Sequence, residues 1–251
     1  MSPLITSVTV FGCVFGGALL GLLLRAALPQ HHLSADSRDV VKLGSGLVGT
    51  MAALVLGLLV ASAKDSYDAQ RNELEQLAAN VGVLDRILAH YGPETQDARA
   101  FLRAAVARVT DTMWSEDKSG ASRSDATSTA GEKLLEKIQG LSPADDRQRA
   151  LQAQAFSLTM TIGQTRWLMY EQRTTSVSRP LLAVLVLWLT VIFVSFGLFA
   201  RANGTVVTSL CVSAMSVSGA IFLILEMYTP YTGLVQISSA PLRAVLAHLG
   251  Q

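Results

Sequence analysis

The sequence predicts an all-α membrane protein with four transmembrane helices and a helical aqueous region inserted between the second and the third. Two observations lead to this fold class. Half of the 251 residues are hydrophobic and only 16% are charged, and the hydrophobic residues gather in four runs that contain no charged side chain. Between the second and third runs, apolar residues recur at alternating steps of three and four, which is the spacing of one face of an α-helix.

The four charge-free runs are residues 2–24, 43–63, 180–200 and 202–225. Each can cross the hydrocarbon core of a bilayer, which is about 30 Å thick and takes roughly 20 helical residues. We expect one transmembrane hairpin in residues 1–63, with spans at 4–27 and 43–63, and another in residues 180–228, with spans at 180–200 and 205–227. The first run is expected to be a retained span, because it is longer than the roughly 7 to 15 apolar residues of a secretory signal and no Lys or Arg precedes Arg25.

The composition and motifs argue against several classes of function. Cys13 and Cys211 are the only cysteines, and both lie inside predicted spans, which excludes a disulfide framework. The net charge of +1 gives no indication of nucleic-acid binding. No catalytic, phosphate-binding or zinc-binding motif occurs. We therefore expect no enzymatic activity, no cofactor and no metal site.

The topology follows from the number of spans. Four spans place both termini on one side of the membrane, together with residues 64–179, the only large aqueous region. Lys and Arg near span ends are disfavoured for translocation and so mark the cytoplasmic side. They are more numerous on the side of the central region, which predicts that this region and both termini are cytoplasmic. The residues on that side are Lys64, Arg71, Arg166, Arg173, Arg179 and Arg243, and those opposite are Arg25, Arg38, Lys42 and Arg201.

The second span is expected to continue without a break into a long amphipathic helix, which Gly92 and Pro93 end. No Gly-Pro pair or turn cluster interrupts the segment between Lys64 and Tyr91, and one stripe of it is almost wholly apolar. We predict that this stripe packs helices together or joins protomers. Its central members are Leu74, Leu77, Val81, Leu84 and Leu88.

The rest of the aqueous region is expected to be helical except for residues 115–131. This segment holds no large apolar residue and cannot offset the entropy cost of ordering, so it is predicted to be a mobile loop. In the tail, residues 229–251, an amphipathic pattern from Ser238 onward predicts a short helix. That helix could lie on the bilayer surface or against the central region.

One side of the second span carries almost no side-chain volume. In one interpretation, this face lets another helix approach closely, as small residues do inside lipid. In the other, it lines a central conduit in an oligomer, with Lys64 forming a charged ring at the inner mouth. Gly12 and Gly16 of the first span, like Gly17 and Gly21, form a GxxxG pair expected to pack helices or protomers. The residues of the face on the second span are Gly46, Gly49, Thr50, Ala53, Gly57, Ala61 and Lys64.

Glu226 follows the apolar sequence AIFLIL near the end of the fourth span. An ionisable residue near membrane depth is a functional candidate. The alternative is an interfacial carboxylate that is exposed to the lipid headgroups. Spacing alone leaves both interpretations open.

Two long segments carry a resemblance to a known family. At residues 54–94 (LVLGLLVASAKDSYDAQRNELEQLAANVGVLDRILAHYGPE) and 220–246 (AIFLILEMYTPYTGLVQISSAPLRAVL), the chain resembles bacterial membrane proteins described as bestrophin-like. The resemblance implies an oligomeric anion channel of the inner membrane, with the second span around an axial pore and the central region in the cytoplasm. The longest acidic run is Asp145-Asp146, unlike the calcium clasp of bestrophins, and the aromatic-rich neck is absent, so no site residue is carried over.

The leading hypothesis is therefore an oligomeric channel, anion-conducting because of Lys64, whose partners are membrane lipids, further copies of the chain and the permeant ion. The alternative is a non-conducting scaffold or signal-relay protein that oligomerises through its cytoplasmic helices. A third hypothesis is a transporter that uses Glu226 as its coupling acid. The chain shows neither the internal repeat nor the broken spans that such transporters usually have.

Overall fold

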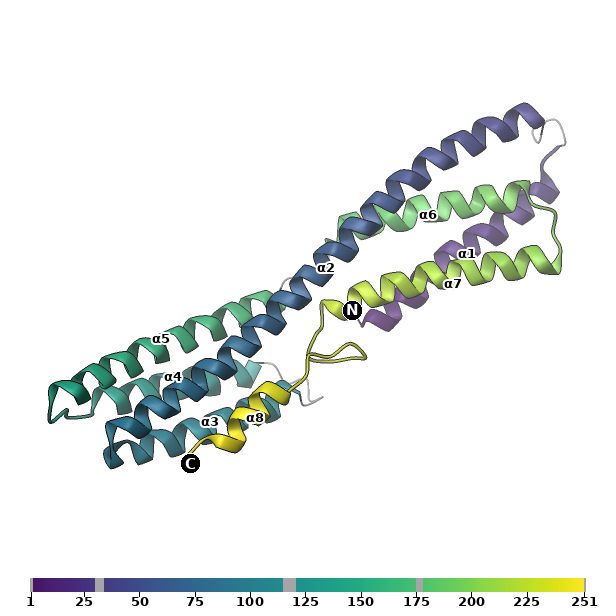
Figure 1. Ribbon diagram of the computed structural model, residues 1–251. Coiled ribbons are helices and arrows are strands. Elements are labelled where there is room, and N and C mark those ends of the chain that lie inside the picture. The colour runs from purple at the N-terminus through teal and green to yellow at the C-terminus, as the bar shows by residue number, and fades with distance from the viewer. Residues whose placement is uncertain (1, 30–33, 115–120, 175–177, 251) are drawn as a thin grey trace. The chain divides into compact units, whose positions relative to one another are not determined.

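The computed structural model describes residues 2–29, 34–114, 121–174 and 178–250, and within these ranges the chain is helical with no strand (Figure 1). The predicted all-α class is confirmed. The elements are α1 (Pro3–Ala27), α2 (Ala35–Tyr91), the short 3₁₀ helix η2 (Pro93–Thr95), α3 (Gln96–Met113), α4 (Ala121–Gln139), α5 (Asp146–Thr174), α6 (Arg179–Phe199), α7 (Gly204–Met227) and α8 (Ala240–His248).

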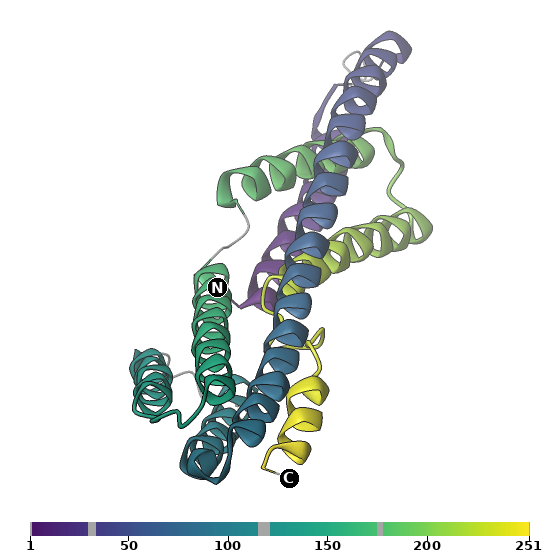
Figure 2. The same ribbon diagram turned by 60° about the vertical axis from the view of Figure 1, so that its left-hand side comes forward.

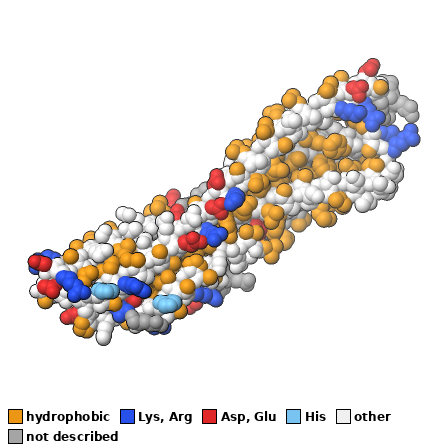
Figure 3. Space-filling view, viewed as in Figure 1, with side chains coloured by type: hydrophobic (Ala, Val, Ile, Leu, Met, Phe, Trp, Pro, Cys, Tyr) orange, Lys and Arg blue, Asp and Glu red, His pale blue; other side chains and the backbone are white. Residues whose placement is uncertain are grey.

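Four of these helices, α1, α2, α6 and α7, are long and apolar enough to cross a membrane. They cover the four predicted spans, except that α6 ends at Phe199, one residue before the predicted end. Over these helices the visible surface is largely hydrophobic, whereas charged side chains gather at the beginning of α2 and over the remaining helices (Figure 3). The surface is therefore divided between a lipid-compatible part and a water-compatible part.

The helices form two compact units, which we describe separately. One consists of Met1–Ser66 with Ser176–Tyr228, and the other of Tyr67–Thr175 with Thr229–Gln251. Helix α2 contributes residues to both and is unbroken over its 57 residues, as the sequence predicts. Its glycines do not end it, because inside lipid every backbone amide must be hydrogen-bonded within the helix.

In the first unit, α1 packs against both α6 and α7 (Figure 1). Close approach depends on two glycines of α1 and one of α6. A Cβ on Gly21 would overlap the carbonyl oxygen of Val194, and a Cβ on Gly197 would overlap that of Ala18. Gly17 is nearly as tight, since its Cβ would lie 2.9 Å from Thr190 Cγ2. The α1–α6 contact is thus backbone against backbone, the arrangement that small residues permit in membranes.

A reciprocal pair of hydrogen bonds joins α1 to α7. The buried Ser7 hydroxyl donates to the Ser218 carbonyl oxygen at 2.9 Å, and the Ser218 hydroxyl donates to the Ser7 carbonyl oxygen at 2.7 Å. Such interhelical bonds contribute about 0.6 kcal/mol each in membrane proteins. They fix the register of the two helices more than they add stability.

In the second unit, the end of α2 is surrounded by α3, α4, α5 and α8 (Figure 2). The residues of α2 that face this core include the central members of the predicted apolar stripe, together with Ala78 and Ile87. Gln148 Nε2 donates to the carbonyl oxygen of Tyr91 at 3.0 Å, which ties α5 to the end of α2. The core therefore consists of the end of α2 and shorter helices of the same chain.

The chain's last helix, α8, belongs to this core. Leu242 and Leu249 are almost fully buried in it, and Gly82 of α2 lies beside Val245. Of the two positions that the sequence leaves open for this helix, packing against the central region is the one observed. The Gly250 amide also donates to Asp85 Oδ2 at 3.3 Å.

The predicted loop at residues 115–131 differs from the structure. Residues 115–120 lie outside the described residues, but residues 121–131 are helical and form the first part of α4. The prediction of a loop is wrong there, because a helix does not need an apolar face along its whole length. No proline interrupts residues 121–139, and Leu134 and Ile138 bury the last turns of α4 in the core.

Candidate pore-lining face

The small-residue face of α2 lies on the surface of the chain. Six of its seven predicted members are exposed, and Gly49 is half-buried. A Cβ built on Gly46 or Gly57 would meet no heavy atom within 4 Å, and one on Gly49 would only reach Ile192 Cδ1 at 4.0 Å. The face is therefore not the site of a close helix contact within its own protomer.

The opposite side of the second span packs against α6 and α7. Ala52, Leu59 and Ala63 are buried in a cluster with Leu185 of α6 and Ile224 of α7. Near the end of the span, Ser62 Oγ and the Tyr228 hydroxyl are 3.1 Å apart and share a hydrogen bond. These contacts fix the rotation of α2, so the part of the small-residue face from Thr50 to Lys64 is exposed on the surface of the unit.

Sequence reasoning missed one member of this face. Val60 lies three residues after Gly57 and four before Lys64, which places it on the same side of the helix. It is 41% exposed and has the largest apolar side chain on the otherwise small-residue face. The three-and-four spacing would have found it, but the search for small residues passed over it.

The polar end of the face is Lys64. Its side chain is exposed, and it is the first charged residue after the charge-free run. The neighbouring Asp65 is also exposed but lies about 100° around the helix from Lys64. Asp68 is half-buried and lies one turn after Lys64, so it is nearer than Asp65 to the side of the helix that carries Lys64.

Gly12 and Gly16 do not take part in the helix packing of the protomer. Neither has any heavy atom within 4 Å of its Cβ position, and both are exposed. The second GxxxG pair of α1, Gly17 with Gly21, makes the contact with α6 instead. The two pairs point in different directions because residues 16 and 17 differ by about 100° around the helix.

The apolar stripe of α2 that follows the charge-free run is buried within the chain. Leu74, Leu77, Val81, Leu84 and Leu88 all lie in the core of the second unit. Their contacts are with helices of the same chain, and they leave no surface for a second copy. The scaffold hypothesis, which needs this stripe as its oligomer contact, loses that contact.

Glu226 is buried, with 5% of its surface exposed, at the end of α7. This contradicts the interpretation of a carboxylate exposed to lipid headgroups. A functional role of Glu226 stays a prediction.

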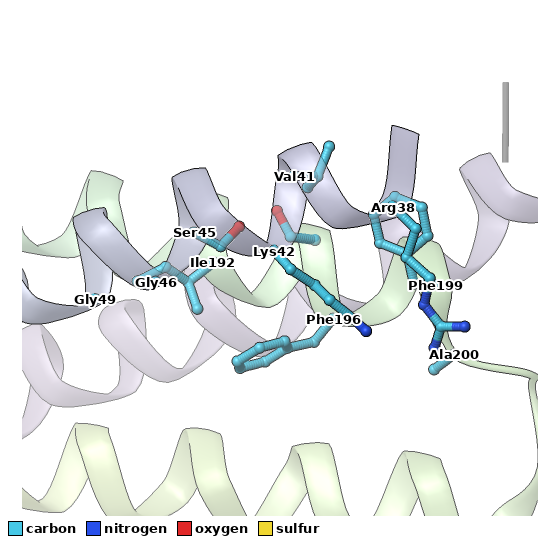
Figure 4. A pocket seen from close by; sticks show the side chains of 11 residues that line it. Arg38, Val41, Lys42, Ser45, Gly46, Gly49, Ile192, Phe196, Phe199 and Ala200 are labelled. Carbon is cyan, nitrogen blue, oxygen red and sulfur yellow. The ribbon is translucent and has the colours of Figure 1, made fainter. Parts of the chain in front are cut away.

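A groove between α2 and α6 was not expected from the sequence. It has a volume of about 490 Å³ and includes two members of the predicted face, Gly46 and Gly49 (Figure 4). Two basic residues of α2, Arg38 and Lys42, lie at one end of it. Their spacing of four residues, directly before a charge-free run, was the signal available in the sequence. The lining is Arg38, Val41, Lys42, Ser45, Gly46, Gly49, Ile192, Ser195, Phe196, Phe199 and Ala200.

A largely buried ion pair lies in the second unit, between Asp85 of α2 and Arg99 of α3. Arg99 Nε and Nη2 donate to the two carboxylate oxygens of Asp85 at 2.8 and 2.9 Å. The side chain of Arg99 is 16% exposed and that of Asp85 is 7% exposed. The hydrogen bond to Asp85 raises the pKa of Arg99 against the opposing effect of burial. Among the described residues, no group of His, Cys, Asp and Glu is arranged to hold a metal ion.

Comparison with known proteins gives one match. A family model described as a bestrophin-like domain matches residues 12–242, which include α2, α6 and α7 in full and α1 from Gly12 onward. No match was found among the curated proteins or among the solved structures.

Proposed function

The chain belongs to the bestrophin-like family, and on this premise we propose that it forms an oligomeric membrane channel with an axial pore lined by one face of α2. The four long apolar helices and the family make it a membrane protein. The single observation that carries the proposal is the open, small-residue face of α2, with nothing within 4 Å of the Cβ position of Gly57.

An open face of this kind has two physical uses in a membrane. Small residues allow the close approach of another helix, but α2 makes its contact within the protomer through the opposite side. In a ring of protomers, the side that points at the symmetry axis has the least room, and small side chains leave space there for an ion. Large exposed residues beside the face, such as Leu54 and Leu58, suit contact with lipid or with a neighbouring protomer.

We assign anion preference to Lys64. Rings of basic side chains at a constriction favour anions, and Lys64 is the first charge that an ion meets after the charge-free stretch. Val60 lies one turn before Lys64 and has the largest apolar side chain of the face, so its copies in a ring would form an apolar constriction. In this proposal both termini and residues 64–179 lie in the cytoplasm of a bacterial cell, with the spans in the inner membrane.

The test is conductance of the purified full-length protein in planar bilayers. Gly57→Trp should abolish most of the current, because a bulky side chain enters the conduit. Leu58→Trp is the matched control, since it makes a similar change one residue away on an exposed position off the face. Equal effects of the two variants would mean that the face does not line the pore.

Selectivity is tested by the reversal potential in a salt gradient. Lys64→Glu should move the reversal potential toward that of the cation, and Lys64→Gln should produce a smaller movement in the same direction. An unchanged reversal potential in both variants would remove Lys64 from the selectivity mechanism. The absence of any conductance from the unmodified protein would contradict the proposal itself.

A further inference from the structure

The groove between α2 and α6 has one end where the membrane's headgroup region begins. Lys42 is the last charged residue before the charge-free run that starts at residue 43, and α6 ends at Phe199. Arg38 lies one helical turn before Lys42. The groove therefore starts at the water boundary and extends toward Gly49 into the hydrocarbon region (Figure 4).

The boundary end of the groove carries positive charge. Arg38 and Lys42 are exposed, and their side chains extend from α2 toward α6 (Figure 4). None of the described residues that line the groove is acidic. Asp39 lies 3.9 Å from Lys42, but both side chains are mostly exposed and such pairs are weak.

The carboxyl end of α6 lies at the same end of the groove, and its negative partial charge partly offsets the positive charge of Arg38 and Lys42. The carboxyl end of a helix carries a partial charge of about −0.5, smaller than the two full positive charges of Arg38 and Lys42. The net potential at this end attracts an anion. A zwitterionic headgroup is less favoured, because its ammonium group would approach the same two cations.

The remainder of the groove suits a hydrocarbon chain. Ile192, Phe196 and Phe199 of α6 form one wall, and the bare backbone at Gly46 and Gly49 forms part of the other. A free inorganic anion would gain nothing from this apolar part. An acyl chain that runs down from a bound phosphate would cover it.

We propose that this groove binds one anionic phospholipid, with its phosphate held by Arg38 and Lys42 and an acyl chain along Ile192 and Phe196. The lipid would fill the groove between α2 and α6, which no side chain of the chain fills. This inference rests on the protein being a membrane protein and is independent of whether it conducts ions.

The experiment is native mass spectrometry of the delipidated full-length protein in detergent, titrated with dioleoylphosphatidylglycerol and, separately, with dioleoylphosphatidylcholine. We expect tighter binding of the phosphatidylglycerol. Arg38→Ala and Lys42→Ala should each weaken it about fivefold, the effect of removing one basic residue near an anionic headgroup. The control is Arg201→Ala, which removes an exposed basic residue next to Ala200 that does not line the groove. Equal weakening by all three variants would mean nonspecific charge attraction and would overturn the site.

A second variant tests the apolar part with the charges kept. Ser195→Phe places a ring in the groove and should reduce phosphatidylglycerol binding by at least as much as Arg38→Ala. Unchanged binding in Ser195→Phe, or displacement of the lipid by millimolar inorganic phosphate, would overturn the assignment to a phospholipid. So would a disulfide between two Ser195→Cys chains that lack Cys13 and Cys211, because a second copy would then occupy the groove.

Discussion

The buried hydroxyl group of Tyr91 reduces the stability of the fold. Its side chain is buried at the end of α2, and its hydroxyl oxygen has no hydrogen-bond partner among the described residues. A buried polar group without a partner costs about 1–3 kcal/mol. We therefore predict that Tyr91→Phe raises the free energy of unfolding by about 1 kcal/mol, measured as a higher midpoint of thermal unfolding in detergent.

The same burial raises the pKa of Tyr91, with smaller contributions from Glu94 and Asp145. A raised folded-state pKa means that the ionised phenol is less favourable in the folded protein than in the unfolded chain. Stability should therefore fall as the pH rises above about 10, the ordinary pKa of tyrosine. Tyr91→Phe should reduce that fall.

Tyr228→Phe is the matched control, because the Tyr228 hydroxyl shares a hydrogen bond with Ser62. It should leave stability unchanged or lower it slightly. If Tyr91→Phe destabilised the protein as much as Tyr228→Phe does, the hydroxyl of Tyr91 would have a partner in solution.

The Asp85–Arg99 pair gives a second prediction at the residue scale. Asp85→Asn leaves the guanidinium of Arg99 without its two-point carboxylate partner, and breaking such a buried pair costs about 3–5 kcal/mol. The change also weakens the bond to the Gly250 amide. We expect a large loss of thermal stability.

Glu75→Gln provides the comparison, since Glu75 pairs with Arg71 at 3.0 Å on the exposed side of the same helix. That pair should contribute only about 0.3–0.5 kcal/mol. Similar losses in Asp85→Asn and Glu75→Gln would show that the Asp85 pair is as solvated as the exposed one.

The contact between α1 and α6 is tested by two glycines of α1. Gly21→Ala should force the two helices apart, because its Cβ would overlap the carbonyl oxygen of Val194. Overpacking of this kind costs about 1–3 kcal/mol. Gly12→Ala should be tolerated by the protomer, since open space surrounds Gly12. The measurement is the thermal stability of each variant in detergent, and equal loss in both would contradict the packing described for α1.

These elements also show what the sequence can and cannot predict. Charge-free runs and three-and-four spacing predicted the four long apolar helices and the continuous α2, because both signals depend on the helix itself. They could not tell which GxxxG pair of α1 meets α6, since that depends on the position of the partner helix. The helical residues 121–131 were missed for the same reason, because the core that anchors α4 at Leu134 is formed by other helices.

For the molecule as a whole, the predicted face of α2 could be identified from residues alone, but its direction could not. A row of small residues suits both a helix contact and a pore wall. The packing of Ala52, Leu59 and Ala63 turns the row outward from the protomer. The groove beside Gly46 and Gly49 could be recognised only once the position of α6 was known. It divides the row into a part that lines the groove and a part, from Thr50 to Lys64, that lies outside it.

The central claim is that this second part faces an axial, water-filled path. The most direct test is the reaction of a negatively charged thiol reagent with Gly57→Cys channels in planar bilayers, in chains whose Cys13 and Cys211 are replaced by alanine. We predict that the reagent blocks the current through Gly57→Cys and leaves the current through Leu58→Cys unchanged. Block at Leu58→Cys with no effect at Gly57→Cys would contradict the account.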